Sequence, residues 1–271
     1  MSDKTKDVPL VDCHAHVYTT DMPLSATAWH HPPADATIEQ YIATLDQHGV
    51  QYAVMAAASL YDDYNEYMIE STVKHKHRLR TTAIVKPSID PYVMRMMRDD
   101  GVVGVRLQWR NVKSLPDITT PEYRKFFRRV RDLDWHVHIN QSGELLDAPL
   151  TALEATGVKI VVDHFGHPQK GKGAACAGQQ AIIRSVAKGR TWVKLSAAYR
   201  LESLDIAEAC ARELLKHCGP ERLLWGSDWP FAAFEDKATY ADCVAAFKHC
   251  VPDESARRII GGETPMRLYF I

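Results

Sequence analysis

Eight short apolar or β-branched runs alternate with longer amphipathic segments along the chain, and this alternation constrains the fold more than any other feature. Eight strand-and-helix repeats in about 250 residues are typical of a (β/α)8 barrel. We therefore predict an α/β protein that folds as one (β/α)8 TIM barrel domain over residues 1–271. The predicted strands lie within residues 9–18, 51–59, 80–86, 102–109, 135–141, 159–165, 191–197 and 222–230.

An open doubly wound sheet would use the same alternation of strands and helices. The dinucleotide site of that fold needs a glycine-rich turn after the first strand, whereas the first run here ends in HAHVYTT (14–20). No linker or low-complexity stretch divides the chain, and the glycine-containing segment 167–178 is predicted to be a loop after the sixth strand. The barrel is therefore the preferred fold, without a dinucleotide site.

The charge balance limits the kinds of partner that the protein can have. The chain has 33 Lys and Arg residues against 34 Asp and Glu residues, which gives a net charge of −1. Nucleic acids and anionic membranes are normally bound by a clear excess of positive charge, so neither is expected. No uncharged apolar run approaches the ~20 residues that span a bilayer, and the cysteines form no CxxC pair. These features predict a cytoplasmic monomer or homodimer that acts on a small molecule.

Polar residues stand at the carboxyl ends of most of the predicted strands, which is where (β/α)8 barrels build their active sites. Period-two alternation predicts that His14 and His16 point to one side of the first strand and that Cys13 points to the other, against a helix. Two structural histidines would be the simplest alternative, but that alternative leaves the other strand ends unexplained. The polar strand-end residues are His14, His16, Ser59, Arg106, His138, Asn140, His164, Ser196 and Asp228.

Asp228 is the strongest candidate for a general base. It follows the apolar run of the eighth strand in LLWGSDWP (223–230), where Trp229 and Pro230 should restrict solvent and fix the backbone. An aspartate after a Gly-Ser pair is also common as a turn or capping residue. The eighth strand by itself leaves both interpretations open.

Five segments together resemble the metal-independent lactonase branch of the amidohydrolase superfamily. The resemblance covers about residues 9–270 and implies that Asp228 takes a proton from water while His14, His16 and His164 bind or polarise a lactone carbonyl. Lactone hydrolysis does need an activated water and hydrogen-bond donors where the oxyanion develops. The resemblance also implies that no metal or other cofactor is required. The segments are VDCHAHVY (11–18), GVRLQW (104–109), VVDHFGHP (161–168), VKLSAAYR (193–200) and WGSDWP (225–230).

Three arginines, Arg106, Arg110 and Arg200, place carboxylate-binding guanidinium groups near strand ends. They suggest that the enzyme opens the ring of a carboxylated lactone, which is 2-pyrone-4,6-dicarboxylate-like, muconolactone-like or a sugar-acid lactone. Solvated loop positions are the alternative for Arg110 and Arg200, and helix caps or loop surface are the alternative for the remaining candidates. Those remaining candidate substrate contacts are Ser59, Asn140 and His31.

A metal-dependent enzyme is the main alternative. His14, His16, His138 or His164, and Asp228 could hold one zinc or other divalent ion, as in the mononuclear decarboxylases and hydrolases of the superfamily. The depth of His138 decides this point, because only a side chain at the barrel mouth could join the ligands. A lactone isomerase would use the same aspartate and arginines, and a non-catalytic binding barrel would use the histidines only as ligand contacts.

Overall fold

The structure is a computed structural model that describes residues 8–110, 112 and 114–271. Its strands form one parallel sheet in which each strand pairs with the next one along the chain. This order, with a helix after every strand, confirms the predicted (β/α)8 barrel. The strands are β1 (Val11–Ala15), β2 (Tyr52–Ala56), β3 (Leu79–Ala83), β4 (Val102–Gln108), β5 (His136–Asn140), β6 (Lys159–Val162), β7 (Thr191–Ser196) and β8 (Leu223–Gly226).

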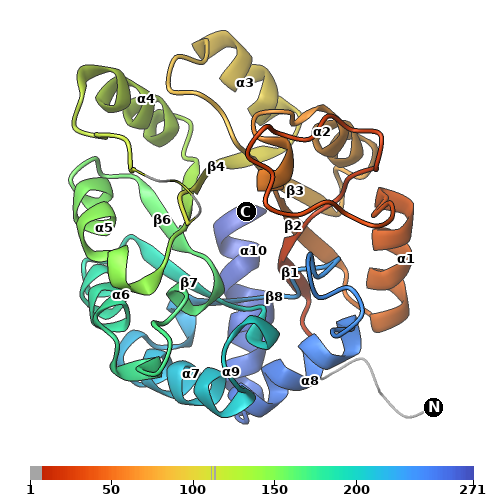
Figure 1. The fold of residues 1–271 in the computed structure, drawn as a ribbon, viewed down its shortest axis with the longest axis vertical. Helices are drawn as coiled ribbons and strands as arrows, with labels where there is room; N and C mark the ends of the chain where they lie inside the picture. The colour runs from red at the N-terminus through yellow and green to blue at the C-terminus, as the bar shows by residue number, and fades with distance from the viewer. Residues whose placement is uncertain (1–7, 111, 113) are drawn as a thin grey trace.

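The helices form a ring around the strands, with α10 near the centre of the view in Figure 1. Their ends follow the local sequence: Thr37 and Gln40 form a capping box at the start of α1, and Gly49 ends that helix with φ 73°. In the described part of the chain, no helix combines the length and the apolar character needed to cross a bilayer. The helices are α1 (Ile38–His48), α2 (Glu66–Lys74), α3 (Pro91–Asp99), α4 (Pro121–Asp132), α5 (Asp147–Glu154), α6 (Ala177–Ala187), α7 (Leu204–Cys218), α8 (Tyr240–Cys250), α9 (Glu254–Arg258) and α10 (Thr264–Tyr269).

The alternation of β1 is interrupted before its histidines. The register of β1 against β2 shifts between Asp12 and Ala15, as in a β-bulge. Cys13 consequently packs inside the barrel, in a buried cluster with Val11 and with Tyr269 of α10. The predicted outward orientation of Cys13 is wrong, because a bulge lets two consecutive residues face the same side of a strand.

The barrel closes between β8 and β1 through the backbone beyond β8. The His16 amide donates a hydrogen bond to the Trp229 carbonyl, and the Asp228 amide donates one to the His14 carbonyl, each at 2.7 Å. A single β-bridge joins Ala15 to Trp229 at the same place. These bonds fix Asp228 relative to the two histidines of β1.

The carboxylate of Asp12 reinforces this closure from inside the protein. Asp12 is fully buried and accepts hydrogen bonds from the amide and the hydroxyl of Ser227. Its Oδ2 also accepts hydrogen bonds from the hydroxyl groups of Tyr41, at 3.0 Å, and Tyr240, at 3.1 Å. Because each of these groups is buried and paired, Asp12 links β1, α1 and α8 to the residue that precedes Asp228.

Candidate active site

A cavity of about 300 Å³ opens at the carboxyl ends of the strands. It gathers most of the site residues that the sequence predicted, and His14 lies next to it in contact with Asp228. His31 is an exception, because it is exposed and does not line the cavity. Its neighbour His30 instead pairs with the half-buried Glu235, at 2.6 Å. The predicted residues in the cavity wall are His16, Ser59, Arg106, Arg110, Asn140, His164, Arg200 and Asp228.

Asp228 has one carboxylate oxygen that is held and one that faces imidazoles. Oδ2 accepts hydrogen bonds from the Tyr199 hydroxyl and from Arg200 Nε, each at 2.7 Å. Asp228 is only 2% exposed, so these donors orient the carboxylate firmly. Around Oδ1 lie three imidazole Nε2 atoms, at 3.3 Å for His16, 3.6 Å for His14 and 3.8 Å for His164.

The surroundings of these groups determine their charge. Burial alone would raise the pKa of Asp228, but the positive charge of Arg200 and the neighbouring imidazoles hold it well below its usual range. Burial lowers the pKa of His164 to about 4 and that of His14 well below its usual value. At neutral pH the carboxylate is therefore ionised and both imidazoles are neutral, so each ring donates a hydrogen bond at one nitrogen and accepts one at the other.

Two of the site residues have strained backbones. His164 follows β6 with φ 51°, and Asp228 follows β8 with φ 65°, so both lie in the left-handed region. A non-glycine residue in this region costs about 1–3 kcal/mol, and such residues cluster where the surrounding structure holds a functional side chain in place. The strain at both strand ends is therefore consistent with a site that requires these two orientations.

The three predicted arginines differ in whether they form ion pairs with carboxylates of the protein. Arg106 is buried, and its Nε donates to Asp163 Oδ2 at 3.1 Å. Arg200 is held by Asp228 at 2.7 Å. Arg110 is exposed at the cavity rim, and no carboxylate of the described chain forms an ion pair with it. Arg110 is consequently the guanidinium most available to an anionic ligand.

A second charged group lies deeper in the barrel than the cavity. Lys194 of β7 and Asp163, which follows β6, are both 0% exposed, and Lys194 Nζ lies 3.1 Å from Asp163 Oδ1. Burial alone would raise the pKa of Asp163, but the charge of Lys194 and the contact with His14 hold it well below its usual range. Neither residue of this pair was predicted as a site residue. The sequence did contain a signal for the pair, because each residue is a charged residue within an apolar strand segment. Charged residues are rarely buried unless they are paired, so two such residues could be expected to meet.

His138 belongs to this deeper group and not to the mouth. Its Nδ1 lies 3.1 Å from Lys194 Nζ, and its Nε2 lies 3.3 Å from the Tyr269 hydroxyl. It is fully buried and does not line the cavity that His164 lines. The alternative prediction that His138 joins His164 in a metal site therefore does not agree with the structure.

Three buried polar atoms in the cavity wall have no hydrogen-bond partner among the described residues. They are Gln108 Oε1, Asn140 Oδ1 and His167 Nε2. Buried polar groups are nearly always paired, so unpaired ones in a cavity wall are suited to a polar ligand or to water. Gln108 and His167 were not predicted as contacts, although both lie in the segments that carry the family resemblance.

Three ligand atoms at the mouth approach the geometry of a metal site. Atoms of His14, His164 and Asp228 lie within 4.8 Å of one another. A guanidinium already lies at this place, because Arg106 Nη2 is 3.4 Å from Nε2 of His14, the nitrogen that a metal would use. The positive charge of Arg106, a residue of β4, would therefore repel a metal ion bound by these three residues.

The total charge also argues against a divalent ion. The buried imidazoles are neutral, so the fixed charges around them are three cations and two carboxylates. A divalent cation would therefore enter a cluster that is already positive, whereas metal sites normally gather anionic or neutral donors. The residues present do not fit a divalent metal ion. The charged residues counted are Arg106, Lys194, Arg200, Asp163 and Asp228.

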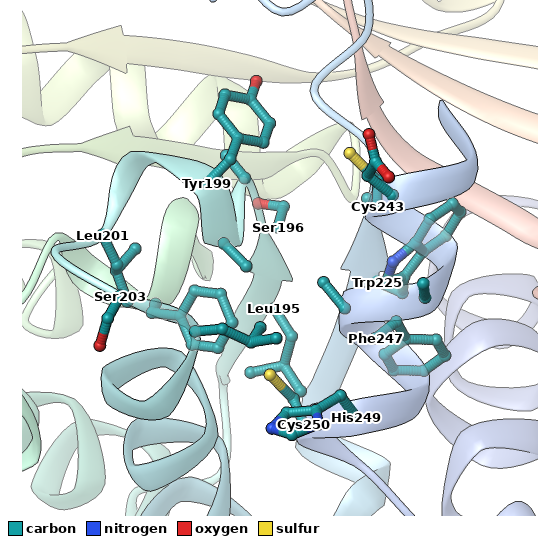
Figure 2. Close-up of a pocket in the computed structure, with 18 of the residues that line it drawn as sticks. Leu195, Ser196, Tyr199, Leu201, Ser203, Trp225, Cys243, Phe247, His249 and Cys250 are labelled. Carbon is teal, nitrogen blue, oxygen red and sulfur yellow. The ribbon is translucent and has the colours of Figure 1, made fainter. Parts of the chain in front are cut away.

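A larger cavity of about 610 Å³ lies outside the barrel wall, between α7 and α8 (Figure 2). Its wall is mainly apolar and includes Leu195, Trp225 and Phe247. Figure 2 shows Tyr199 at the edge of this cavity, where its ring forms part of the wall. The Tyr199 hydroxyl donates a hydrogen bond to Asp228, so this side chain links the wall of the outer cavity to a residue of the mouth cavity.

The fold and these strand-end groups agree with the family assignment. The sequence profile of the family described as amidohydrolase matches residues 11–271, and the chain belongs to this family of enzymes. Among characterised relatives, the 2-pyrone-4,6-dicarboxylate hydrolase of Comamonas testosteroni is 29% identical, over 96% of this chain and 90% of its own. The 4-sulfomuconolactone hydrolase of Hydrogenophaga intermedia is 24% identical, over 95% of this chain and 88% of its own.

Two further proteins extend this comparison. The D-galactarolactone isomerase of Agrobacterium fabrum is 23% identical, over 96% of this chain and 90% of its own. The crystal structure of a probable 2-pyrone-4,6-dicarboxylic acid hydrolase from Acinetobacter baumannii, with citric acid bound, superposes with a TM-score of 0.92. It is 29% identical and covers 97% of this chain and 100% of its own.

Proposed function

We propose that this enzyme hydrolyses the ring ester of a carboxylated lactone, with Asp228 as the base that takes a proton from the attacking water. The observation that carries this proposal is the position of Asp228 Oδ1, which faces three imidazoles beside the cavity. The relatives named as hydrolases of a pyrone dicarboxylate and of a sulfomuconolactone support the substrate class.

The reaction divides between a base and hydrogen-bond donors. The water oxygen attacks the lactone carbonyl, and the water proton passes to Asp228; when the ring C–O bond breaks, that proton returns to the departing ring oxygen. Neutral imidazole N–H groups stabilise the oxyanion that develops between these steps. His16 donates its Nδ1 proton to the Ala56 carbonyl at 2.6 Å, so it can donate from Nε2 into the site only when both of its ring nitrogens carry a proton.

An anionic substrate also adjusts the strength of the base. In the free enzyme the Arg200 guanidinium holds the pKa of Asp228 low, although burial opposes this, and a low pKa makes a weak base. A substrate carboxylate beside Arg110 and Arg200 offsets that positive charge and thereby makes Asp228 more basic when the substrate is bound. This coupling gives carboxylated lactones an advantage over neutral lactones in turnover as well as in binding.

We further propose that the reaction proceeds without a metal ion. The excess of fixed cations around His14 and the guanidinium beside its Nε2 support this proposal. Arg106 and the imidazole donors supply the positive and hydrogen-donating groups that a Lewis acid would otherwise supply.

Migration of the acyl group between two hydroxyls is the second candidate, because a galactarolactone isomerase is among the relatives. It would use the same base and the same anion-binding groups. Reaction in ¹⁸O-labelled water separates the two activities, since hydrolysis places one labelled oxygen in the product carboxylate and isomerisation places none.

The decisive experiment is a screen of pyrone dicarboxylates, muconolactones and aldarolactones, each paired with its methyl ester. The protein is assayed after metal analysis, with and without a chelator. We expect ring opening of at least one free acid, little turnover of its ester and no effect of the chelator. Stoichiometric zinc whose removal abolishes turnover would contradict the metal-free mechanism, and turnover of neutral esters alone would contradict the substrate class.

A further inference from the structure

Lys194 places a charged amine at the centre of the barrel. It projects from β7, is 0% exposed, and lies beneath the cavity wall that the proposed catalytic groups form. Its Nζ lies 3.0 Å from His14 Nδ1, 3.1 Å from His138 Nδ1 and 3.1 Å from Asp163 Oδ1. An ammonium group has N–H donors and no acceptor, so in both of its hydrogen bonds to the imidazoles it is the donor and Nδ1 is the acceptor, while Asp163 supplies the opposite charge.

This arrangement determines which nitrogen of His14 carries the proton. Burial keeps the His14 imidazole neutral, so it holds one ring proton. If Nδ1 accepts a hydrogen bond from Lys194, the proton must be on Nε2. Nε2 is the nitrogen that faces the site, at 3.6 Å from Asp228 Oδ1. Arg106 Nη2 also lies 3.4 Å from Nε2 and would favour a bare Nε2, but this contact is longer than the 3.0 Å contact of Lys194 with Nδ1. Asp163 keeps the amine paired with an opposite charge, which a buried ammonium requires.

The Nδ1-protonated tautomer of His14 would also have a hydrogen-bond acceptor, so both tautomers can form in this structure. Asp163 Oδ1 lies 3.3 Å from His14 Nδ1 and would accept a proton from it if the ammonium were absent. His14 would then present a bare Nε2 to the site and could no longer donate there. Removal of the Lys194 charge should therefore exchange one tautomer for the other.

We propose that Lys194 is a positioning residue that fixes His14 in the Nε2-protonated tautomer, so that His14 donates a hydrogen bond to the oxyanion formed in the cavity. The inference rests on the proposed lactone hydrolysis for its kinetic consequence, whereas the tautomer itself can be observed without a substrate. Lys194 acts through His14 and does not touch the substrate, since it does not line the cavity.

The tautomer is measured by long-range ¹H–¹⁵N NMR of the protein labelled with ¹⁵N-histidine, with the His14 signals assigned from a His14→Gln variant. We expect an Nε2-protonated His14 in the wild type and in Lys194→Arg, and an Nδ1-protonated His14 in Lys194→Met. Wild-type His14 protonated on Nδ1 would overturn the proposal. This test remains valid even if Lys194→Met fails to fold.

Kinetics provide the second measurement. Lys194→Met should lower kcat by about 100- to 1000-fold, the effect of losing one oxyanion donor, with a much smaller change in KM. Tyr269→Phe is the matched control, because it alters the same buried chain at His138 Nε2 and should leave both the His14 tautomer and kcat unchanged. A switched tautomer with unchanged kcat, or an unchanged tautomer in folded Lys194→Met, would refute the role of Lys194.

Different results would contradict the proposed lactone hydrolysis and the positioning role of Lys194. If none of the lactones is hydrolysed but the His14 tautomer follows Lys194 as expected, the proposed function is wrong and the positioning by Lys194 stands. If lactones are hydrolysed and the tautomer does not depend on Lys194, the proposed function stands and the positioning is wrong.

Discussion

The cavity at the barrel mouth and the cavity between α7 and α8 have different lining residues and differ in chemistry. The outer cavity is about twice as large, at 610 Å³ against 300 Å³, yet its wall is mainly apolar. The lining residues explain the difference, since Leu195, Trp225 and Phe247 line the outer cavity whereas charged and imidazole groups line the cavity at the mouth. Volume alone therefore does not locate a reaction site; the convergence of strand ends does.

Replacement of Asp228 by Asn should give the largest difference between the two cavities. Loss of the base should lower kcat by about 100-fold or more. Asp242→Asn is the matched control, because Asp242 lines the outer cavity and an asparagine oxygen can still accept from the Thr239 amide at the start of α8. Steady-state kinetics on both variants check this. Near-wild-type turnover by Asp228→Asn would show that the reaction does not take place in the mouth cavity.

Replacement of Arg110 by Gln should give the next largest effect. Arg110 is exposed at the mouth and forms no ion pair with the described residues, so its loss should raise KM for a free-acid lactone by about 10- to 100-fold, the strength of one charged hydrogen bond. The KM for the corresponding methyl ester should change little. Equal changes for acid and ester would mean that Arg110 does not bind the substrate carboxylate.

Replacement of Tyr199 by Phe tests the side chain that links the outer cavity to Asp228. The Tyr199 hydroxyl stabilises the ionised form of Asp228, so its removal should raise the pKa of Asp228. A higher pKa means that Asp228 becomes protonated at higher pH, so the acidic limb of the kcat/KM profile should move to higher pH. Turnover at neutral pH should fall by less than about tenfold. A profile that stays in place would show that this limb does not report Asp228.

Replacement of Cys250 by Ala in the outer cavity should give the smallest effect on turnover. Cys250 is buried, and burial raises the pKa of its thiol to about 12, so it should not react with thiol reagents in the native protein. The substitution should lower the free energy of unfolding by about 1 kcal/mol and leave kcat within twofold of the wild type. Denaturant titration and kinetics measure the two quantities, and a large loss of kcat would indicate that the outer cavity acts on the site.

The barrel and the positions of its polar strand ends follow from the amino-acid sequence alone. Strand and helix periodicities are local, and the parallel order of a barrel brings all carboxyl ends to one rim, so His16, His164 and Asp228 could be placed together in advance. The apolar runs also predicted the strands, although β6 and β8 end before His164 and Asp228 because the chain turns into left-handed backbone there.

Which charged groups are ion-paired and which are available to a ligand depends on tertiary contacts. Lys194 and His14 are separated by 180 positions in the chain yet lie in contact, and Arg106 meets Asp163 across 57 positions. The bulge in β1 and the exposure of His31 are likewise set by packing between distant segments. Ion pairing and burial depend on distances between segments, whereas periodicity reports only which side of its own strand or helix a residue occupies.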